Sequence, residues 1–337
     1  MKQVRRWMTA MCFTAIVGGA NADVNETLLL EQALAQFGFS ETTLTVDDHE
    51  LTYYYSARTD RPRNLVLFIQ GTDPFPLFFY ELTDSGPNFF TAFPDDAAHL
   101  SDDYAYVVVA KPALSGIRQW QHFEVPQAYH DANYRQRRIS DIRAVITHLK
   151  RRRLSEGGDI VVYGHSEGAQ VGASLARVDS RITHLGFWSG NVLNNFYEFA
   201  LFERLAALNG QQSDTQAHQN IMGLLEWYRS VVDDPQSTEV DEWGYTNRRW
   251  ASYRHAPIDD LLALDIPIYA QFASEDDSTP IETAYLLPVQ FITAGKDNLN
   301  FQVCLGCDHS YQEVIDGDLR DHWSEIFEDF VDWVEAH

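Results

Sequence analysis

Short apolar runs recur along the chain and alternate with longer segments in which apolar residues return every three or four positions. The short runs are typical of buried β-strands, and the longer segments are typical of amphipathic helices. Strands are expected at 42–57 (two strands around a polar turn), 64–71, 104–112, 159–164, 182–190, 266–274 and 300–306. Helices are expected at 134–154, 169–178 and 321–337. This alternation predicts an α/β fold with a mostly parallel sheet covered by helices on both faces.

The segment 134–154 has the clearest helical period. One face of the expected helix carries the aliphatic residues Ile139, Ile142, Val145, Ile146 and Leu149. The arginines and the lysine of this segment are expected on the opposite face.

Residues 191–260 interrupt the alternation because they contain no good strand. Two stretches, 194–210 and 220–232, have helical spacing, and the polar stretch 233–249 follows them. We interpret 191–260 as a helical cap inserted over the carboxyl edge of the sheet. The core of the fold would then consist of 23–190 and 261–337.

The first 22 residues have the pattern of a secretory signal peptide. Lys2, Arg5 and Arg6 precede the apolar run 7–20, and Ala20-Asn21-Ala22 provides a small-residue cleavage site. A membrane anchor is the alternative, but the apolar run is short for a span of about 20 residues. The sequence therefore predicts an exported protein, periplasmic or secreted, that is cleaved near Ala22.

The chain is strongly acidic, with a formal net charge of -24. Loss of the three basic residues of the signal segment would take this charge to -27. Such a charge repels nucleic acids and anionic membrane surfaces, so neither is expected as a partner, and no stable membrane anchor is expected. The charge does not indicate the fold, the natural substrate or the oligomeric state.

One pentapeptide, Gly164-His165-Ser166-Glu167-Gly168, fits the pattern G-x-S-x-G. In a nucleophile elbow the serine occupies a strained turn between a strand and a helix, and glycines two residues away avoid a collision with neighbouring elements. The alternative is a glycine-rich turn that happens to contain a serine. An expected strand precedes this pentapeptide and an expected helix follows it, which is the context that a nucleophile requires. Ser166 is therefore the candidate nucleophile.

On these residues the chain resembles the α/β-hydrolase fold superfamily, in which a nucleophile, an acid and a histidine follow one another along the chain. The resemblance extends from Leu51 to the C-terminus. The segment "IPIYAQFASEDDSTP" (266–280) is similar to the acid-bearing segment of that superfamily, which implies that Asp276 is the acid. The neighbouring Asp277 and Glu275 remain alternatives. His309 follows the last expected strand, which is where the superfamily places its base.

The same resemblance implies two backbone donors for an oxyanion. One is the N–H of Glu167, at the start of the helix after the serine. The other is the N–H of Thr72, in the loop "QGTDP" after the strand 64–71, although Gln70 stands where a histidine is common. An ordinary strand–turn–helix connection is the alternative for this loop. His165 is expected to point away from the serine.

Cys304 and Cys307 are the two cysteines that remain after the signal segment, and an exported protein would pair them as a disulfide. A redox-active pair would be expected at the start of a helix, which is not their place. A zinc site with His309 would need a fourth ligand and would remove the base from catalysis, so no metal is expected. No cofactor is expected either, since no G-x-G-x-x-G opens a helix.

Together these features predict an exported serine hydrolase that cleaves ester bonds through an acyl-enzyme on Ser166, most simply a carboxylesterase. Many aromatic residues in 73–90 and in the insertion favour an apolar substrate, although most of them would serve packing. The alternative is an aminopeptidase-like enzyme of the same fold, which would pair a substrate ammonium with a carboxylate. A catalytically inactive binding protein is the alternative from another class. The carboxylates placed to bind an ammonium group are Glu167, Asp73, Glu198 and Glu203.

Overall fold

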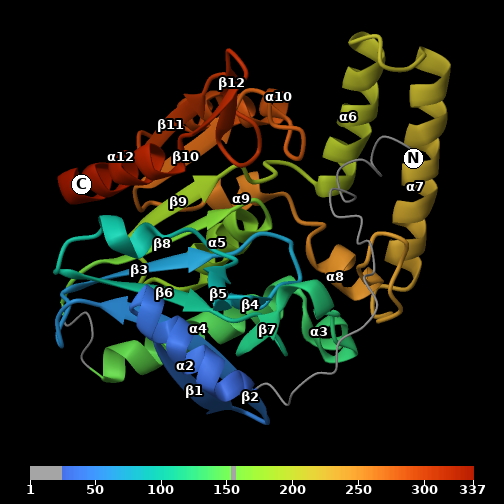
Figure 1. Ribbon diagram of the computed structural model, residues 1–337. Coiled ribbons are helices and arrows are strands. Elements are labelled where there is room, and N and C mark those ends of the chain that lie inside the picture. The colour runs from blue at the N-terminus through green and yellow to red at the C-terminus, as the bar shows by residue number, and fades with distance from the viewer. Residues whose placement is uncertain (1–24, 153–156) are drawn as a thin grey trace.

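The computed structural model describes residues 25–152 and 157–337, so the expected signal peptide lies outside the described residues. Its central feature is an eight-stranded sheet with the order β1-β2-β6-β3-β8-β9-β10-β11 (Figure 1). The strands are β1 (Ser40–Val46), β2 (His49–Ala57), β3 (Asn64–Ile69), β6 (Tyr104–Val109), β8 (Ile160–His165), β9 (His184–Trp188), β10 (Ile268–Ala273) and β11 (Leu299–Cys304). Every strand expected from the hydrophobic pattern is present, most of them shortened by a few residues at their ends.

The sheet is antiparallel at one edge and parallel elsewhere. β1 pairs with β2, and β2 pairs with β6, in antiparallel register, whereas the five remaining pairs are parallel. β3 and β8 lie at the centre, with Leu65 opposite Ile160. The carboxyl ends of the parallel strands therefore meet at one edge of the sheet, which is where such folds place their functional loops.

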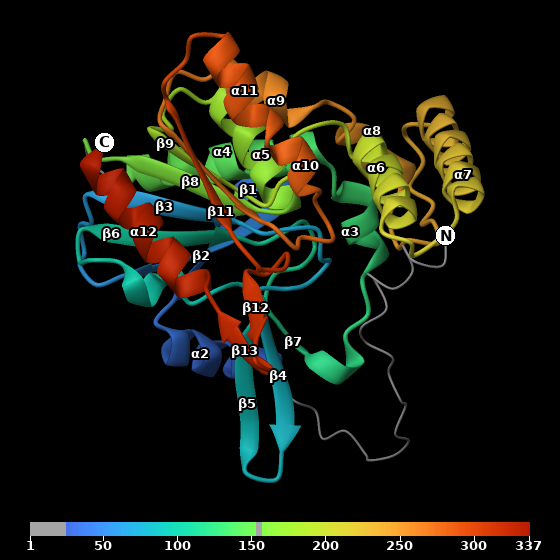
Figure 2. The ribbon, with the colours of Figure 1, turned by 90° about the horizontal axis from the view of Figure 1, so that it is seen from above.

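Helices cover both faces of this sheet, and a separate hydrophobic cluster lies under each set (Figure 2). One face is covered by α4 (Arg135–Arg151), α5 (Glu167–Val178), α9 (Pro257–Leu262), α10 (Ile281–Ala284) and α11 (Leu286–Thr293). The other face is covered by α2 (Glu26–Phe37) and α12 (Trp323–Ala336). The α/β prediction is confirmed.

The polar face of α4 departs from the amphipathic pattern. Its aliphatic residues pack into the core as expected, but Arg135 and Arg138 are also buried. The prediction that all arginines lie opposite the core is therefore wrong at these two positions. The reason is that other elements supply partners: the Arg135 guanidinium lies over the ring of Tyr253, and Arg138 pairs with Glu167.

The insertion contains the two long helices that its periodicity predicts. α6 (Asn195–Leu208) and α7 (Asp214–Asp233) lie side by side and extend away from the sheet (Figure 1). α7 begins before the apolar stretch because the Ser213 hydroxyl accepts a hydrogen bond from the Gln216 N–H and caps the helix. The short helix α8 (Asn247–Ser252) packs against α7 and leads back toward the sheet. Phe196, Val231, Tyr245 and Trp250 form a separate core among these helices.

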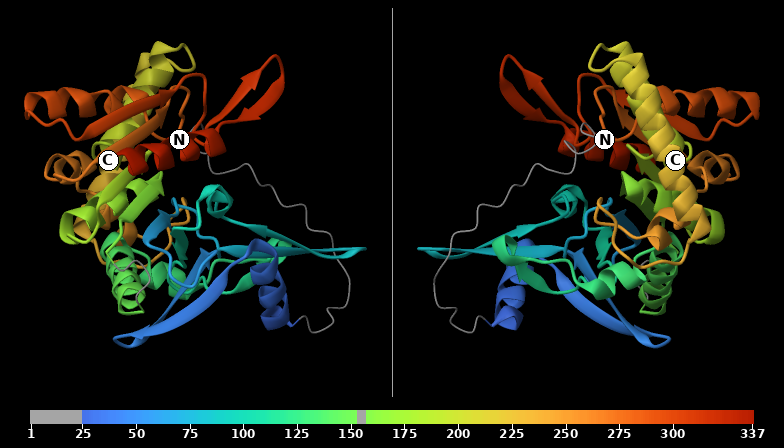
Figure 3. Two further views of the ribbon diagram at one scale, coloured as in Figure 1. Left: turned by 90° about the vertical axis from the view of Figure 1, so that its left-hand side faces the viewer. Right: turned by 90° about the vertical axis from the view of Figure 1, so that its right-hand side faces the viewer.

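Several elements have no counterpart in the predicted pattern. A separate three-stranded sheet consists of β4 (Phe78–Thr83), β5 (Gly86–Thr91) and β7 (Ile117–Gln119). Three short helical elements are η1 (Asp96–His99), η2 (Trp120–His122) and α3 (Gln127–Ala132). A hairpin of β12 (Gln312–Ile315) and β13 (Asp318–Asp321) precedes α12. The two hairpins β4–β5 and β12–β13 project from the same side of the molecule (Figure 3).

None of the helices within 25–152 and 157–337 combines the length and the hydrophobicity that a bilayer-spanning helix requires.

Candidate active site

Ser166 occupies the sharp turn between β8 and α5. Its backbone has φ 58° and ψ -125°, a conformation that costs free energy for any residue other than glycine. A Cβ on Gly164 would lie 2.3 Å from the carbonyl group of Gly168, and a Cβ on Gly168 would lie 1.9 Å from the Ile69 carbonyl oxygen. Both glycines are therefore needed for the turn to form. This is the geometry of a nucleophile elbow and presents the serine at the carboxyl end of β8.

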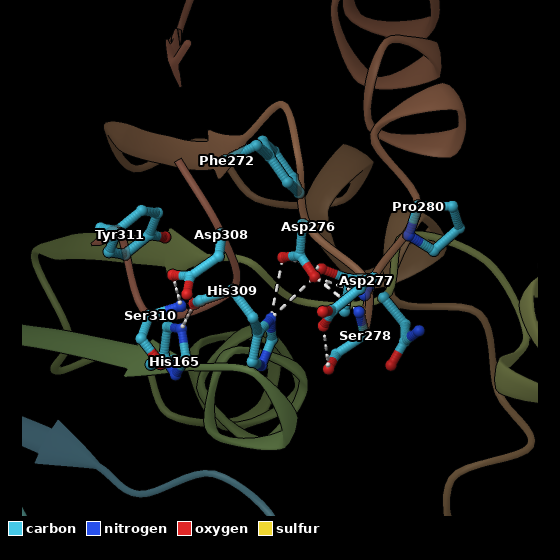
Figure 4. Close-up of polar contacts among 12 residues, drawn as sticks. His165, Phe272, Asp276, Asp277, Ser278, Pro280, Asp308, His309, Ser310 and Tyr311 are labelled. Carbon is cyan, nitrogen blue, oxygen red and sulfur yellow. Dashed lines mark hydrogen bonds and ion pairs between the residues drawn. The ribbon is translucent and has the colours of Figure 1, made fainter. Parts of the chain in front are cut away.

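Asp276 and His309 form a close pair on the loops that follow β10 and β11 (Figure 4). The two carboxylate oxygens of Asp276 lie 2.8 and 3.0 Å from His309 Nδ1. Asp276 also accepts hydrogen bonds from the N–H groups of Ser278 and Thr279, each at 2.8 Å, and from the Thr279 hydroxyl at 2.7 Å. These contacts fix both the carboxylate and the orientation of the imidazole.

Each member of this pair stabilises the charged form of the other. Burial alone would raise the pKa of Asp276, but His309 and the Thr279 donors hold it below its ordinary value. Burial alone would lower the pKa of His309, but the charge and the hydrogen bond of Asp276 raise it above its ordinary value. At a pH above its pKa the imidazole of His309 is neutral and can accept a proton. Asp276 then stabilises the positive charge of the protonated imidazole.

The structure distinguishes Asp276 from its neighbours. The carboxylate of Asp277 accepts a hydrogen bond from the Ser278 hydroxyl at 3.3 Å rather than from the imidazole. Asp308 caps a turn, since its Oδ1 accepts from the N–H groups of Ser310 and Gln312, each at 2.9 Å. Of the acidic residues near His309, Asp276 is thus the one that contacts Nδ1.

Ser166 and His309 both line one large cavity at the carboxyl edge of the sheet. Among the described residues no hydrogen bond joins the Ser166 hydroxyl to the imidazole. The contact to the His309 loop comes from His165, the residue before Ser166. Its Nε2 is 2.7 Å from the His309 carbonyl oxygen, and the centres of the two rings are 4.6 Å apart (Figure 4). Burial and the nearby His309 lower the pKa of His165 to about 3, so its neutral ring donates the Nε2 proton to that carbonyl. His165 thus supports the loop that carries His309.

The loop after β3 lies against Ser166 on the other side. A Cβ on Gly71 would be only 3.2 Å from the Ser166 Cβ, and Thr72 follows directly in the wall of the cavity. Glu167 begins α5, so its N–H is one of the free donors at the helix N-terminus. Thr72 thus lines the same cavity as Ser166, and the Glu167 N–H follows the serine directly in the chain.

The side chain of Glu167 is buried in a cluster of positive charges. Its carboxylate pairs with Arg138 of α4 at 2.8 Å and with Arg249 of α8, and only 2% of the residue is exposed. Burial alone would raise the pKa of Glu167, but Arg249, Arg138 and Lys111 hold it below its ordinary value. We define Lys111, Arg138, Glu167 and Arg249 as the buried charge cluster.

Sequence reasoning did not identify the three cations of this cluster. Arg138 was assigned to a solvent face, and Arg249 lies at the end of a polar stretch. Lys111 could have been found from the sequence, because it stands two residues after the apolar strand "YAYVVV", at the edge where the other parallel strands end. A lysine at that place points to the functional edge of the sheet.

The cavity has a volume of about 1830 Å³ and two aromatic walls. One wall comes from the segments around β4, β5 and η2, where the rings of Phe79 and Trp120 meet edge to face at 4.8 Å. The other comes from the insertion, which contributes Phe199, Phe202, Trp227, Trp243, Tyr245 and Trp250. Other aromatic residues of the insertion serve packing, as expected: Phe196 stacks on Tyr228 with ring centres 3.9 Å apart.

Cys304 and Cys307 are paired as a disulfide, with their Cα atoms 5.5 Å apart. The Cys304 and Cys307 carbonyl oxygens accept hydrogen bonds from the N–H groups of Ser274 and Glu275, at 3.0 and 2.9 Å. The bridged turn therefore joins the loop of Asp276 to the loop of His309. Within the described residues it is His322, rather than His309, that lies close to the two sulfur atoms.

The structure is similar to several solved hydrolases. Acylaminoacyl peptidase from Pyrococcus horikoshii matches with a TM-score of 0.55 and 12% identity over 88% of this chain, which spans only 42% of the peptidase. Est1E from Butyrivibrio proteoclasticus matches with a TM-score of 0.51 and 12% identity, over 88% of this chain and 99% of Est1E. The α/β hydrolase GrgF from Penicillium sp. sh18 matches with a TM-score of 0.54 and 14% identity, over 89% of this chain and 98% of GrgF.

No family model matches the sequence, and no curated protein matches it. At this level of identity the similar structures establish the fold alone. The protein has the α/β-hydrolase fold, as the elbow and the order of the candidate residues predicted.

Proposed function

We propose that this protein is a serine hydrolase that cleaves carboxylic esters through an acyl-enzyme on Ser166. The observation that supports it best is the convergence of four loops, those after β3, β8, β10 and β11, on one cavity. These loops present a serine on an elbow, a histidine held by a carboxylate, and backbone donors beside the serine. The combination supplies a nucleophile, a base and oxyanion stabilisation.

In the proposed reaction the Ser166 oxygen attacks the acyl carbonyl while His309 accepts the hydroxyl proton. Asp276 stabilises the imidazolium, and the N–H groups of Glu167 and Thr72 donate to the oxyanion. The tetrahedral intermediate collapses to an acyl-enzyme, and His309 gives its proton to the leaving alcohol. Water then attacks the acyl-enzyme while His309 accepts its proton. The bond between the acyl carbon and the Ser166 oxygen breaks, His309 returns the proton to that oxygen, and the acid product leaves.

The surroundings of the carboxylates favour an ester over a peptide with a free N-terminus. Glu167 is neutralised by two arginines. Glu198 is fully buried and accepts hydrogen bonds from Asn191, Val192, Leu193 and Thr283. Glu203 accepts from the side chains of Gln212 and Asn220. Three of the four carboxylates proposed as receptors for an ammonium group are therefore occupied by protein donors.

The aromatic walls of the cavity favour substrates with apolar or aromatic groups. Est1E, one of the similar proteins, has been solved with ferulic acid bound. Acylaminoacyl peptidases also share the fold, so the fold by itself does not decide between ester and peptide substrates.

The test is a comparison of two substrate classes on purified protein. We expect p-nitrophenyl esters of short and aromatic acids to be hydrolysed at least about 100-fold faster, by kcat/KM, than aminoacyl p-nitroanilides. Faster cleavage of the anilides would favour the peptidase alternative. Turnover of neither class, together with binding of an ester without cleavage, would favour an inactive binding protein.

We further propose that the protein is exported and cleaved near Ala22. The basic start, the apolar run and the A-x-A pattern of 1–22 support this, and so does the Cys304–Cys307 disulfide, since oxidising compartments preserve such bonds. N-terminal sequencing of the mature protein is expected to begin at Asp23.

A further inference from the structure

We propose that Lys111 is a positioning residue of the oxyanion hole, which holds and polarises the peptide group that donates the Thr72 N–H. This inference rests on the function proposed above. It assigns a role to a buried cation at the site that sequence reasoning did not identify. Lys111 is 4% exposed and lies in the wall of the cavity.

The ammonium of Lys111 binds the backbone of the oxyanion loop directly. Its Nζ donates to the Gly71 carbonyl oxygen at 2.7 Å and also to the Asp73 carbonyl oxygen. The Gly71 carbonyl belongs to the same peptide group as the Thr72 N–H. Because this peptide is trans, its C=O and N–H point in opposite directions. By fixing the Gly71 carbonyl, Lys111 therefore directs the Thr72 N–H away from itself.

Arg138 gives the same loop a second hold. Its Nη2 donates to the Gln70 carbonyl oxygen at 2.6 Å, and its Nη1 donates to the Glu167 carboxylate at 2.8 Å. One guanidinium thus joins the residue before Gly71 to the residue whose N–H is the other proposed oxyanion donor. Buried charged groups thus hold the two proposed donors in place relative to each other.

The charge of Lys111 adds to its positioning effect. A cation on a carbonyl oxygen withdraws electron density from the peptide group and makes its N–H a stronger donor, as hydrogen bonds in a chain reinforce one another. In a buried site this effect is larger than in water. A neutral donor in the place of Lys111 would retain part of the geometry without this polarisation.

The protonation state of Lys111 provides a signature that a purely structural role would lack. Burial, together with the charges of Arg138 and Arg249, lowers the pKa of Lys111 to about 7, against the opposing effect of Glu167 and Asp73. Lys111 is therefore charged below pH 7 and loses its proton as the pH rises. His309 must be neutral to act as base, which favours higher pH. We expect the two requirements to give a bell-shaped profile of kcat against pH.

The experiment compares wild type, Lys111→Gln and Lys111→Arg in p-nitrophenyl ester hydrolysis between pH 5.5 and 9.5, followed at a wavelength where the product absorbance is independent of pH. We expect Lys111→Gln to lower kcat about 10- to 100-fold with KM within about threefold, less than the loss of an oxyanion donor itself. It should also remove the decrease in rate above pH 7. Lys111→Arg stays charged and should recover part of the rate without that decrease.

The matched control is Lys150→Gln, at an exposed lysine near the end of α4, which should behave as wild type. A folded Lys111→Gln protein with wild-type kcat would overturn the inference. If Lys111→Gln does not fold, Lys111→Arg provides the test. A decrease in kcat above pH 7 that persists in Lys111→Arg overturns the inference. A wild-type profile that does not fall above pH 7 overturns it as well.

Ser166→Ala, measured in the same assay, separates the two proposals. If Ser166→Ala is inactive while Lys111→Gln is as active as wild type, the serine mechanism stands and the role of Lys111 is wrong. If Ser166→Ala retains the activity, the proposed function itself fails.

Discussion

The two sides of the candidate site are held in place by different forces. On the oxyanion side, Arg138 and Arg249 enclose the Glu167 carboxylate, and all three residues are at most 5% exposed. On the acid–base side, the Asp276–His309 pair is held by backbone N–H groups and a hydroxyl, and the disulfide-bridged turn before His309 accepts backbone hydrogen bonds from the loop of Asp276. One side depends on the balance of buried charges and the other on hydrogen bonds to fixed loops.

This difference predicts which property each substitution will change. A buried ion pair gains little over a well-packed apolar contact, yet the removal of one partner leaves an uncompensated charge. Damage to the oxyanion side should therefore reduce stability as well as activity. Damage to the acid–base side should reduce activity first, because Asp276 acts mainly on the tautomer and charge of His309.

The largest expected effect is on turnover, from Asp276→Asn. An amide at this position would not stabilise the imidazolium and would favour the wrong imidazole tautomer, so we expect kcat to fall about 10⁴-fold. The pKa of His309, which Asp276 holds above its ordinary value, should fall as well. Steady-state kinetics and a pH profile of kcat/KM measure both.

Asp277→Asn is the matched control for this substitution. Because its carboxylate contacts Ser278 rather than the imidazole, kcat should stay within about threefold of wild type. Equal losses in the two variants would show that the acid has been misassigned.

The next effect is on stability, from Glu167→Gln. The change leaves Arg138 and Arg249 without their shared countercharge, and we expect the free energy of unfolding to fall by about 3–5 kcal/mol. Guanidinium chloride unfolding, followed by circular dichroism, measures it. Glu226→Gln, at an exposed position of α7, should change the free energy of unfolding by less than about 0.5 kcal/mol. An unfolding midpoint of Glu167→Gln equal to that of wild type would mean that the ion pairs are not formed.

The smallest expected effect comes from Cys304→Ser. The bridge closes a loop with a sequence separation of only 3, so its loss should lower the free energy of unfolding by about 2 kcal/mol. Since the bridged turn contacts the Asp276 loop through Ser274 and Glu275, kcat should fall by less than tenfold. Calorimetry and turnover, each with and without reductant, measure these changes. If both are unchanged, the bridge does not brace the acid–base side.

The acid–base side and the elbow could be predicted from the sequence because their signals are local. An apolar strand, two glycines around Ser166 and small residues after it specify the elbow within a few positions. Asp276 and His309 each follow an expected strand. Their order along the chain restricted the choice, although Asp277 could be separated from Asp276 only by the hydrogen bonds in the structure.

The buried charge cluster could not be predicted because its partners are far apart in sequence. Arg138 and Glu167 are 29 positions apart, and Glu167 and Arg249 are 82 positions apart. Helical periodicity assigned Arg138 to the solvent, and only a partner from another element makes its burial tolerable.

The hairpin β4–β5 was missed for a different reason. Its aromatic residues were interpreted as part of a pocket wall, so their strand pattern was not considered. The polar residues Asp84 and Ser85, between the paired Thr83 and Gly86, were the available signal for a tight turn. Both interpretations apply here, because Phe79 and Phe90 belong to the strands and also line the cavity.

The central claim, that Ser166 is an activated nucleophile, is tested most directly by reaction with a fluorophosphonate followed by intact-mass and peptide analysis. Our account predicts one adduct per chain, located on Ser166, and no adduct on Ser166→Ala under the same conditions. Absence of an adduct on the folded wild-type protein, or an adduct that persists in Ser166→Ala, would contradict it.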